Sequence, residues 1–476
     1  MTESWATFRA DFGADLHLDL TAGRGLRAGL VEALRDAARS GRLAPGTRLP
    51  SSRSFAADLG IARNTVAEAY AELVAEGWLT ARQGSGTRVA ERARPRRPAG
   101  AARARQPAPQ WPSYSLVPGT PDLGRFPRAG WLAAARRALT DAPNEAFGYG
   151  ADARGRVELR EALAGYLARA RGVYADPERI VLCAGFVHAL TLLAGVLRAR
   201  RVREVAVEGY SLDLHRELLT GAGLRTRPLT VDGAGARTPD LTGESGAVLL
   251  TPAHQFPTGV ALTPARRAAA VDWARTTGGL ILEDDYDGEF RYDRQAVGAL
   301  QGLDPDRVVY LGTASKSLAP GLRMGWMVVP PGLLDEVVAA KGRTDWTSSA
   351  LEQLTLAEFI RSGAYDRHVR GMRLQYRRRR DELVAAVSGR VAVSGIAAGL
   401  HAVLDLPAGT QGQVLRAAAW QDLALETLSR YIHPESGLPP REAGGGGGGP
   451  PAPQPRAPAP GGRYAGRPGW PAPPPP

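Results

Sequence analysis

Residues 280–290 read LILEDDYDGEF, a short apolar run that gives way at once to a cluster of acids. A run of three or four large apolar residues has the length of a buried strand and is too short for a helix. Helical segments separate such strands from one another, and this alternation predicts an α/β domain with a largely parallel sheet. The other runs of this kind are residues 180–182, 205–207, 247–250 and 308–311.

Polar residues follow each predicted strand at its carboxyl end. In open α/β sheets this edge is where ligand-binding groups gather. We therefore expect a ligand site there, and its candidate residues are Gly185, Tyr210, His254, Asp284, Tyr286, Thr313 and Lys316.

This set of residues suits pyridoxal 5'-phosphate. Lys316, in residues 312–326, GTASKSLAPGLRMGW, offers the amine that forms a Schiff base. Asp284 can pair with a pyridinium nitrogen, and Tyr286, two residues on along a strand, can reach the phenolate oxygen from the same side. Phosphate favours arginine, hydroxyls and a helix start, which are offered by Arg323, Thr313, Ser315 and the segment Gly185, Phe186 and Val187.

Each of these residues has an ordinary interpretation when it is taken alone. A lysine in a serine-rich loop is usually solvated, an acidic cluster is often a turn, and Tyr149 and Tyr210 can simply pack. Cys183 has the character of a small buried residue rather than a nucleophile. The cofactor hypothesis therefore rests on the combination.

The N-terminal part predicts three helices followed by a β-hairpin. Apolar residues recur at helical spacing in three segments, and a glycine follows each of them. Ser51 or Ser52 is the expected cap of the second helix. The hairpin has a glycine-rich tip, so the order of elements predicts a winged helix-turn-helix, an α+β fold. The segments are residues 26–34, 55–59 and 66–74, with the hairpin at 78–89.

In this fold the third helix enters the DNA major groove. Arg63 and Asn64, at its start, suit direct pairing with guanine and adenine, and Thr65 lies beside them. Arg53 and Arg82 suit phosphates, which position a protein without specifying a sequence. The alternative is that all of these are solvated residues of a small helical domain.

Composition narrows the class of protein. The 476 residues include 60 Lys+Arg against 48 Asp+Glu, and the formal charge of +12 favours a polyanionic partner such as nucleic acid. No apolar run approaches the ~18 residues of a membrane span, and the N-terminus lacks the features of a secretory signal. A single cysteine cannot form an internal disulfide, which suits a reducing cytoplasm. We expect a cytoplasmic protein with no membrane contact and no metal ion.

Two low-complexity stretches divide the chain. An Arg/Pro/Ala-rich segment has the composition of a linker, and the end of the chain is rich in Gly and Pro and is expected to be disordered. The domains are therefore predicted as residues 14–90, a linker at 91–113, residues 114–440 and a tail at 441–476.

Residues 41–89, GRLAPGTRLPSSRSFAADLGIARNTVAEAYAELVAEGWLTARQGSGTRV, closely resemble the DNA-binding domain of GntR-type bacterial transcription regulators. The resemblance implies binding to a double-stranded DNA operator. It makes Arg53, Arg63, Asn64, Thr65 and Gly84 the candidate contacts.

Residues 115–435 resemble the fold-type I aminotransferases. The motifs that carry the likeness are GTPDLGRFP, TPAHQFPTG, EDDYDGEF and GTASKSLAPGLRMGW. The resemblance implies Lys316 as the Schiff-base lysine, Asp284 on the pyridine nitrogen and Tyr286 on the 3'-oxygen. It further implies that phosphate is held by Thr313 and Arg323, that Tyr210 stacks near the ring, that Tyr149 reaches the other protomer's phosphate, and that Arg430 takes an α-carboxylate.

One motif departs from the aminotransferase pattern. Aminotransferases usually carry Asn before Pro-Thr-Gly, whereas this chain has Phe256, preceded by His254 and Gln255. The variant HQFPTG is characteristic of the MocR-type subfamily of GntR regulators, which the whole chain resembles. That likeness implies a head-to-tail homodimer and a cofactor-dependent regulator that senses a small amine or amino acid.

Two other functions remain open from the sequence. Nearly every group needed for transamination is present, so the chain can be an aminotransferase with an added DNA-binding domain. It can also be a repressor whose cofactor site is degenerate. Near the C-terminus, the Gly/Pro composition replaces an expected strand and helix, so we expect residues 400–404 to form a strand with an exposed edge.

Overall fold

The computed structural model describes residues 6–8, 16–18, 25–82, 86–91, 112–149, 152–292, 297–345 and 348–437. The chain divides into two units, Met1–Gln110 and Trp111–Pro476, which are described separately below. Gly84, most of the predicted linker and the whole predicted tail lie outside the described residues.

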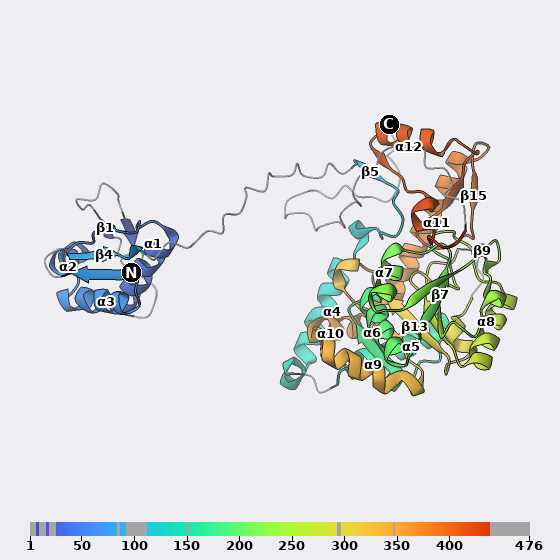
Figure 1. Ribbon diagram of the computed structural model, residues 1–476, viewed down its shortest axis with the longest axis horizontal. Helices are drawn as coiled ribbons and strands as arrows, with labels where there is room; N and C mark the ends of the chain where they lie inside the picture. Colours follow the sequence, from blue (N-terminus) through green and yellow to red (C-terminus); the bar gives the residue numbers. More distant parts are fainter. Residues whose placement is uncertain are drawn as a thin grey trace. The chain divides into compact units, whose positions relative to one another are not determined.

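The first unit has the predicted three helices and hairpin (Figure 1). Its cap residues act as the sequence indicates. Gly41 and Gly60 end α1 and α2 in the left-handed conformation, with φ of 81° and 66°, which costs glycine nothing. The Ser51 hydroxyl accepts a 3.1 Å hydrogen bond from the Ser54 N–H at the start of α2. The elements are β1 (Ala6–Phe8), β2 (Leu16–Leu18), α1 (Leu26–Ser40), α2 (Ser52–Leu59), α3 (Arg63–Ala75), β3 (Leu79–Arg82) and β4 (Gly86–Val89).

One apolar core holds this unit together. Leu30 and Leu34 of α1 meet Phe55 of α2 and Leu73 of α3, and all four side chains are buried. The Arg35 guanidinium also forms two hydrogen bonds, of 2.9 and 2.6 Å, with the carboxylate of Glu76 just after α3. The helices are thus fixed relative to the hairpin, and the start of α3 is left at the surface.

The second unit is built on a seven-stranded sheet of order β6-β14-β13-β12-β11-β7-β8. Its strands are parallel except β14, which runs antiparallel to both neighbours. The five apolar runs of the sequence are five of these strands, so the predicted α/β fold is confirmed. The bounds are β6 (Ile180–Cys183), β7 (Glu204–Glu208), β8 (Arg225–Leu229), β11 (Ala247–Leu250), β12 (Leu280–Asp284), β13 (Val308–Thr313) and β14 (Gly325–Val328).

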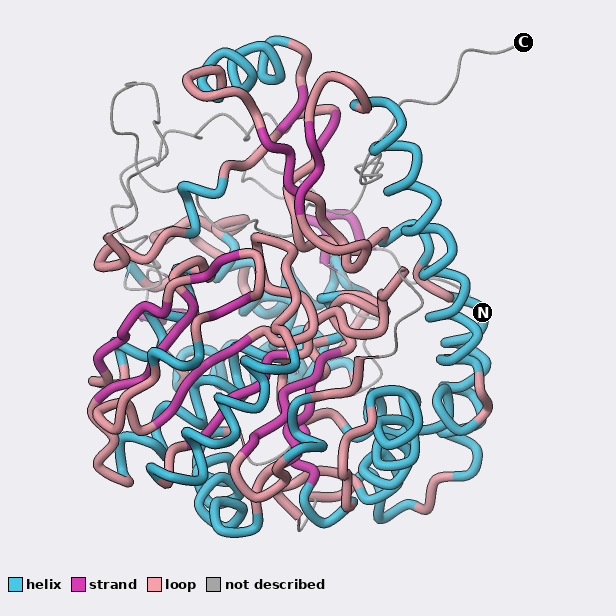
Figure 2. The backbone as a smooth tube through the Cα atoms, turned by 90° about the vertical axis from the view of Figure 1, so that its right-hand side faces the viewer, coloured by secondary structure: helices cyan, strands magenta, loops and turns pink. Residues whose placement is uncertain are grey.

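Alternate residues of each strand enter the cores on the two faces of the sheet. In β6, Ile180 and Leu182 pack with α5, whereas Val181 and Cys183 pack with α6 and α9. Figure 2 shows the strands in a row among the helices. The helices of this unit are α4 (Arg128–Asp141), α5 (Val157–Arg171), α6 (Phe186–Ala199), α7 (Asp213–Gly221), α8 (Pro264–Thr277), α9 (Pro331–Thr344), α10 (Ala350–Arg361) and α11 (Ala364–Val387).

A smaller subdomain follows α11. It contains β15 (Ala392–Ser394) paired with β16 (Val403–Asp405), then α12 (Gln411–Trp420), β17 (Leu423–Ala424) paired with β5 (Tyr114–Ser115), and a short 3-10 helix, Leu428–Tyr431. The strand expected at residues 400–404 begins only at Val403. The residues before it contact other loops instead: the Gly399 N–H donates to the oxygen of Phe290, and Gly399 packs against the ring of His254. Two further short strands, β9 (Val231–Asp232) and β10 (Gly235–Ala236), pair with each other antiparallel and follow β8 in the chain.

Among the described residues, no helix combines the length and the apolar composition that crossing a lipid bilayer would require.

Candidate functional site

Lys316 lies in the turn after β13, and its amine points into the protein. The ammonium donates a hydrogen bond to the backbone oxygen of Gly119. Burial lowers the pKa of this amine, and the carboxylates of Asp284 and Asp287 oppose the shift. A lowered pKa increases the fraction of neutral amine, which is the form that attacks a carbonyl carbon.

Asp284 is the last residue of β12, and its side chain is buried. Its Oδ1 atom has no hydrogen-bond partner among the described residues. Burial raises the pKa of Asp284 well above the usual range, and the neighbouring Asp285 and Asp287 raise it further. An orphaned carboxylate oxygen of this kind calls for an N–H donor, and the protonated pyridine nitrogen of pyridoxal phosphate is one.

The N-terminus of α6 and the side chain of Arg323 lie together at the edge of the sheet. Gly185 is the residue just before α6, its N-cap, and has φ of 86°. The N–H groups in the first turn of a helix have no partner within the helix. A Cβ atom at position 185 would lie 3.5 Å from Nη1 of Arg323, so this guanidinium lies directly against the start of α6. Its Nη2 donates a 2.5 Å hydrogen bond to the oxygen of Ala184. Gly185, Phe186, Val187 and Arg323 thus fit a phosphate.

Thr313 and Ser315 face each other on the turn that carries Lys316. Their hydroxyls are 2.9 Å apart, and the Thr313 hydroxyl accepts a 3.1 Å hydrogen bond from the Ser315 N–H. The hydroxyl groups predicted to bind phosphate are therefore held together by short contacts within one turn.

The HQFPTG turn brings His254 and Phe256 to Tyr286. Nδ1 of His254 is 3.2 Å from the Tyr286 hydroxyl and 2.8 Å from Oδ2 of Asp287. The Phe256 ring meets the Tyr286 ring edge-on at 6.0 Å. Where aminotransferases place an amide before Pro-Thr-Gly, this chain therefore has an aromatic ring, and the polar contact to Tyr286 comes from His254.

Tyr210 is buried after β7, and its backbone pairs with Ile432 of the smaller subdomain. The side-chain amide of Gln255 donates to the oxygen of Tyr210 at 2.8 Å. Arg430, two residues before Ile432, is half-exposed and forms a 2.7 Å ion pair with Glu426. The structure thus joins Tyr210 to the segment of Arg430 through the backbone, while the guanidinium itself is engaged by Glu426.

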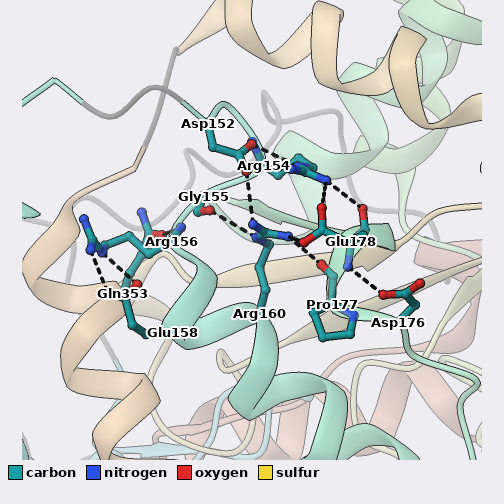
Figure 3. A network of polar contacts seen from close by, with 10 residues as sticks. All are labelled: Asp152, Arg154, Gly155, Arg156, Glu158, Arg160, Asp176, Pro177, Glu178 and Gln353. Carbon is teal, nitrogen blue, oxygen red and sulfur yellow. Dashed lines mark hydrogen bonds and ion pairs between the residues drawn. The ribbon is translucent and has the colours of Figure 1, made fainter.

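Asp152 and the residues that follow it are held by a network of ion pairs (Figure 3). Asp152 accepts hydrogen bonds from Arg154 and Arg160, and both arginines also reach the carboxylate of Glu178. Tyr149 itself is fully exposed, at 102% of its reference area. The network thus fixes the chain from Asp152 onward, and the Tyr149 side chain has no cover from the described residues.

Four further residues belong to this site, and three of them, His215, His401 and Asp287, were not predicted as site residues. The ring of His215 in α7 contacts that of Phe186, with centroids 4.6 Å apart and the planes tilted by 39°. Burial lowers the pKa of His215 to about 4, and the charges of Arg216 and Lys316 add to the effect. His401 stacks on His254, while Asp287 and Gln255 fix the His254 turn. Only Gln255 and Asp287 had a signal in the sequence, since each lies within a motif already quoted.

A cavity of about 820 Å³ adjoins these loops on the side of the smaller subdomain. Thr120, Pro257, His401 and Tyr431 are among its lining residues. Thr120 follows Gly119, to which Lys316 donates, so a small ligand has room close to the lysine.

The candidate DNA contacts of the first unit lie at its surface. Arg53, Arg63, Asn64 and Arg82 are exposed, and Thr65 is half-buried. Within the described part of the chain, no ion pair or hydrogen bond engages the side chains of the three arginines. Charged groups without internal partners suit contacts with a polyanion.

The chain matches two family models. Residues 26–89 match "Bacterial regulatory proteins, gntR family", a DNA-binding helix-turn-helix domain, and residues 123–428 match "Aminotransferase class I and II".

Curated relatives contain the same combination along most of their length. The regulatory protein MocR of Rhizobium meliloti is 33% identical over 89% of this chain and 91% of its own. The pyridoxine biosynthesis transcriptional regulator PdxR of Corynebacterium glutamicum is 32% identical over 84% of this chain and 88% of its own. The transcriptional regulator TauR of Rhodobacter capsulatus is 34% identical over 73% and 76%.

Several solved structures similar to this chain are aminotransferases. An archaeal alanine:glyoxylate aminotransferase has a TM-score of 0.62 and 26% identity, covering 68% of this chain and 84% of its own. The kynurenine aminotransferase of Pyrococcus horikoshii has a TM-score of 0.60 and 25% identity, covering 67% and 82%.

Proposed function

Because the chain belongs to the MocR-type family of transcription regulators, which join a GntR helix-turn-helix domain to an aminotransferase class I and II domain, we propose that pyridoxal 5'-phosphate controls its binding to an operator. The observation that carries the proposal is the buried Asp284 oxygen without a partner, in the same site as the buried amine of Lys316. DNA lies in the bacterial cytoplasm, where the protein would act.

When bound, pyridoxal phosphate supplies an aldehyde that condenses reversibly with primary amines. Lys316 would hold that aldehyde, Asp284 the ring nitrogen, and Tyr286 with His254 the phenolic oxygen. Tyr210 would cover the ring. The phosphate would lie at the start of α6, within reach of Gly185, Phe186, Val187, Thr313, Ser315 and Arg323.

An amine or amino acid would compete with Lys316 for the aldehyde and enter through the adjoining cavity. Its carboxylate would take Arg430 from Glu426, exchanging one anionic partner for another. A shift in DNA affinity then requires that the ligand bind two arrangements of the protein unequally, typically by about 1–3 kcal/mol.

A homodimer would allow two arrangements of its subunits, which the ligand could bind unequally. Tyr149 is exposed, and Asp152, three residues later, is held by its ion pair with Arg160. This exposure supports a contact in which Tyr149 reaches the phosphate of the partner subunit. Two winged helices in one dimer would bind two half-sites, and the movement between them would be the regulated quantity.

Electrophoretic or fluorescence titration of operator fragments tests the proposal at a fixed salt concentration. We expect added pyridoxal phosphate, and then candidate amines, to change the dissociation constant at least threefold. The protein would instead be a simple repressor if neither pyridoxal phosphate nor an amine changes its affinity for DNA and it has no visible absorbance after reconstitution.

Aminotransferase activity is the second candidate function, since the lysine, the aspartate and the phosphate-binding groups are all present. The two functions differ in turnover. Release of keto acid at a steady rate from an added amino acid supports the enzyme, whereas a single spectral change without release supports the regulator.

Replacing Arg63 by alanine should weaken operator binding about 10- to 100-fold and relax the preference at one base pair, because a bidentate arginine–guanine contact is worth about 1–3 kcal/mol. Competition with mutated operators measures both effects. Arg39→Ala is the matched control, since Arg39 is an exposed arginine of α1 that is paired with Asp36. Equal losses in the two variants would exclude a specific contact of Arg63.

A further inference from the structure

The hydrogen bonds behind Tyr286 converge on one carboxylate, that of Asp287. This side chain is buried, with 1% of its area exposed. Nδ1 of His254 lies 2.8 Å from Asp287 Oδ2 and 3.2 Å from the Tyr286 hydroxyl. The Asp287 carboxylate also interacts directly with the Tyr286 hydroxyl. The proton on His254 therefore decides whether His254 is a further acceptor for the hydroxyl proton of Tyr286.

A neutral histidine carries its proton on one of two nitrogens, and the partner of each nitrogen selects the form. A carboxylate at 2.8 Å can only accept, so it draws the proton to Nδ1 of His254. Nδ1 then has no lone pair to offer, and it cannot accept the hydroxyl proton of Tyr286. That proton stays on the tyrosine oxygen.

We infer that Asp287 is a positioning residue which, by fixing the Nδ1-protonated form of His254, keeps Tyr286 available as a hydrogen-bond donor to the cofactor's phenolic oxygen. The inference rests on the proposed binding of pyridoxal phosphate. It also explains how the site functions with Phe256 in place of the amide that aminotransferases carry before Pro-Thr-Gly.

A second histidine packs against the ring of His254. His401 stacks on it with ring centroids 4.5 Å apart and an interplanar angle of 30°. His401 is half-buried, it is hydrogen-bonded to the backbone of Pro257, and its Nε2 has no partner among the described residues. The other groups that face the pair are Tyr286, Phe256 and the Lys316 ammonium.

The same cluster does not suit a metal ion, although His254, Asp287 and His401 bring donor atoms within 4.8 Å of one another. A histidine binds metal in the plane of its ring, with the nitrogen about 2.0–2.1 Å from zinc. Two stacked rings cannot both direct such a lone pair at one ion. The arrangement is that of a carboxylate orienting a histidine.

The pH titration of the visible band of the reconstituted protein tests the inference. A donor at the phenolic oxygen holds the pKa of the cofactor's titrating proton down, so losing it raises that pKa. Asp287→Leu should place the midpoint of the band about one pH unit above that of Asp287→Asn, which is a typical size for the loss of such an interaction. Both variants lose the carboxylate that raises the pKa of the Lys316 amine, so that effect cancels between them. Asp287→Asn should keep the donor, because its amide oxygen still accepts the Nδ1 proton.

A double-mutant cycle with Tyr286→Phe separates this role from a general structural one. In the Tyr286→Phe background, Asp287→Leu should no longer have a higher midpoint than Asp287→Asn, because the donor that Asp287 acts through is gone and both variants lack the same charge near Lys316. An equal difference between the two variants in both backgrounds overturns the inference, as does an Asp287→Asn variant that behaves like Asp287→Leu.

The outcomes also distinguish this inference from the proposed function. A wild-type protein without a visible band contradicts the binding of pyridoxal phosphate itself. A normal wild-type band whose midpoint is the same in all Asp287 variants leaves the proposed function intact and removes only the role of Asp287. Should Asp287→Leu fail to fold, the Asp287→Asn and Tyr286→Phe pair still decides, since a midpoint shift in Asp287→Asn that equals the one in Tyr286→Phe contradicts the inference.

Discussion

Lys316→Ala should abolish the visible absorbance of the reconstituted protein, and borohydride should then fix no cofactor on the chain. The sequence makes this test unusually clear, because Lys316 and Lys341 are its only lysines. The amine of Lys316 lies in the buried site beside Asp284, whereas Lys341 is fully buried and forms a 2.7 Å ion pair with Asp345. No other lysine can replace the lost amine. An absorbance scan and the mass of the reduced protein measure the result.

Lys341→Met is the matched control. It should keep the visible band and the reducible adduct, and melt at a lower temperature, because Asp345 loses its partner. A band of normal intensity in Lys316→Ala, or its loss in Lys341→Met at temperatures where the protein is folded, would contradict the assignment of Lys316.

Much of the sheet was predictable because its strands are buried on both faces. Val181 and Leu182 enter different cores, and a strand of this kind needs a continuous apolar run, which is the signal that identified it. Strand β8 gave no such signal, because only Leu229 of Arg225–Leu229 is buried. Strand β14 (Gly325–Val328) is not predicted either, since its first two residues belong to the motif GTASKSLAPGLRMGW, whose residues are interpreted for their chemistry.

The candidate site divides in the same way. Lys316, Asp284 and Tyr286 were predictable because they follow strands and carry distinctive chemistry. His215 and His401 were not, because each comes from a distant segment and reaches the site only through tertiary packing. Gly399 illustrates the point, since a Cβ atom there would lie 2.2 Å from the ring of His254, and nothing near it in sequence indicates this approach.

The acidic cluster that defines the site also makes the fold depend on one arginine. Asp285 follows Asp284, and its side chain is 1% exposed. Arg171, at the end of α5, donates two hydrogen bonds to it, of 2.7 and 2.9 Å, and the Tyr310 hydroxyl adds a third of 2.7 Å. Arg171 is thus the cation that compensates the charge of Asp285, which has other buried acids before and after it in the sequence.

Arg171→Met should destabilise the second unit by about 3–5 kcal/mol, because removing one partner of a buried ion pair leaves the other charge uncompensated. The methionine can fill much of the volume, so the loss reports charge rather than a cavity. Urea unfolding, followed by tryptophan fluorescence, measures it.

Arg169→Met provides the comparison on the same helix. Arg169 also makes two hydrogen bonds to a carboxylate, that of Asp366, but its side chain is 60% exposed. Water solvates both charges when such a pair is broken, so this change should cost at most about 1 kcal/mol. If the two variants lose the same stability, burial is not what makes Arg171 important. If Arg171→Met alone is destabilised and Asp285→Asn in that background restores part of the loss, the uncompensated carboxylate is the cause.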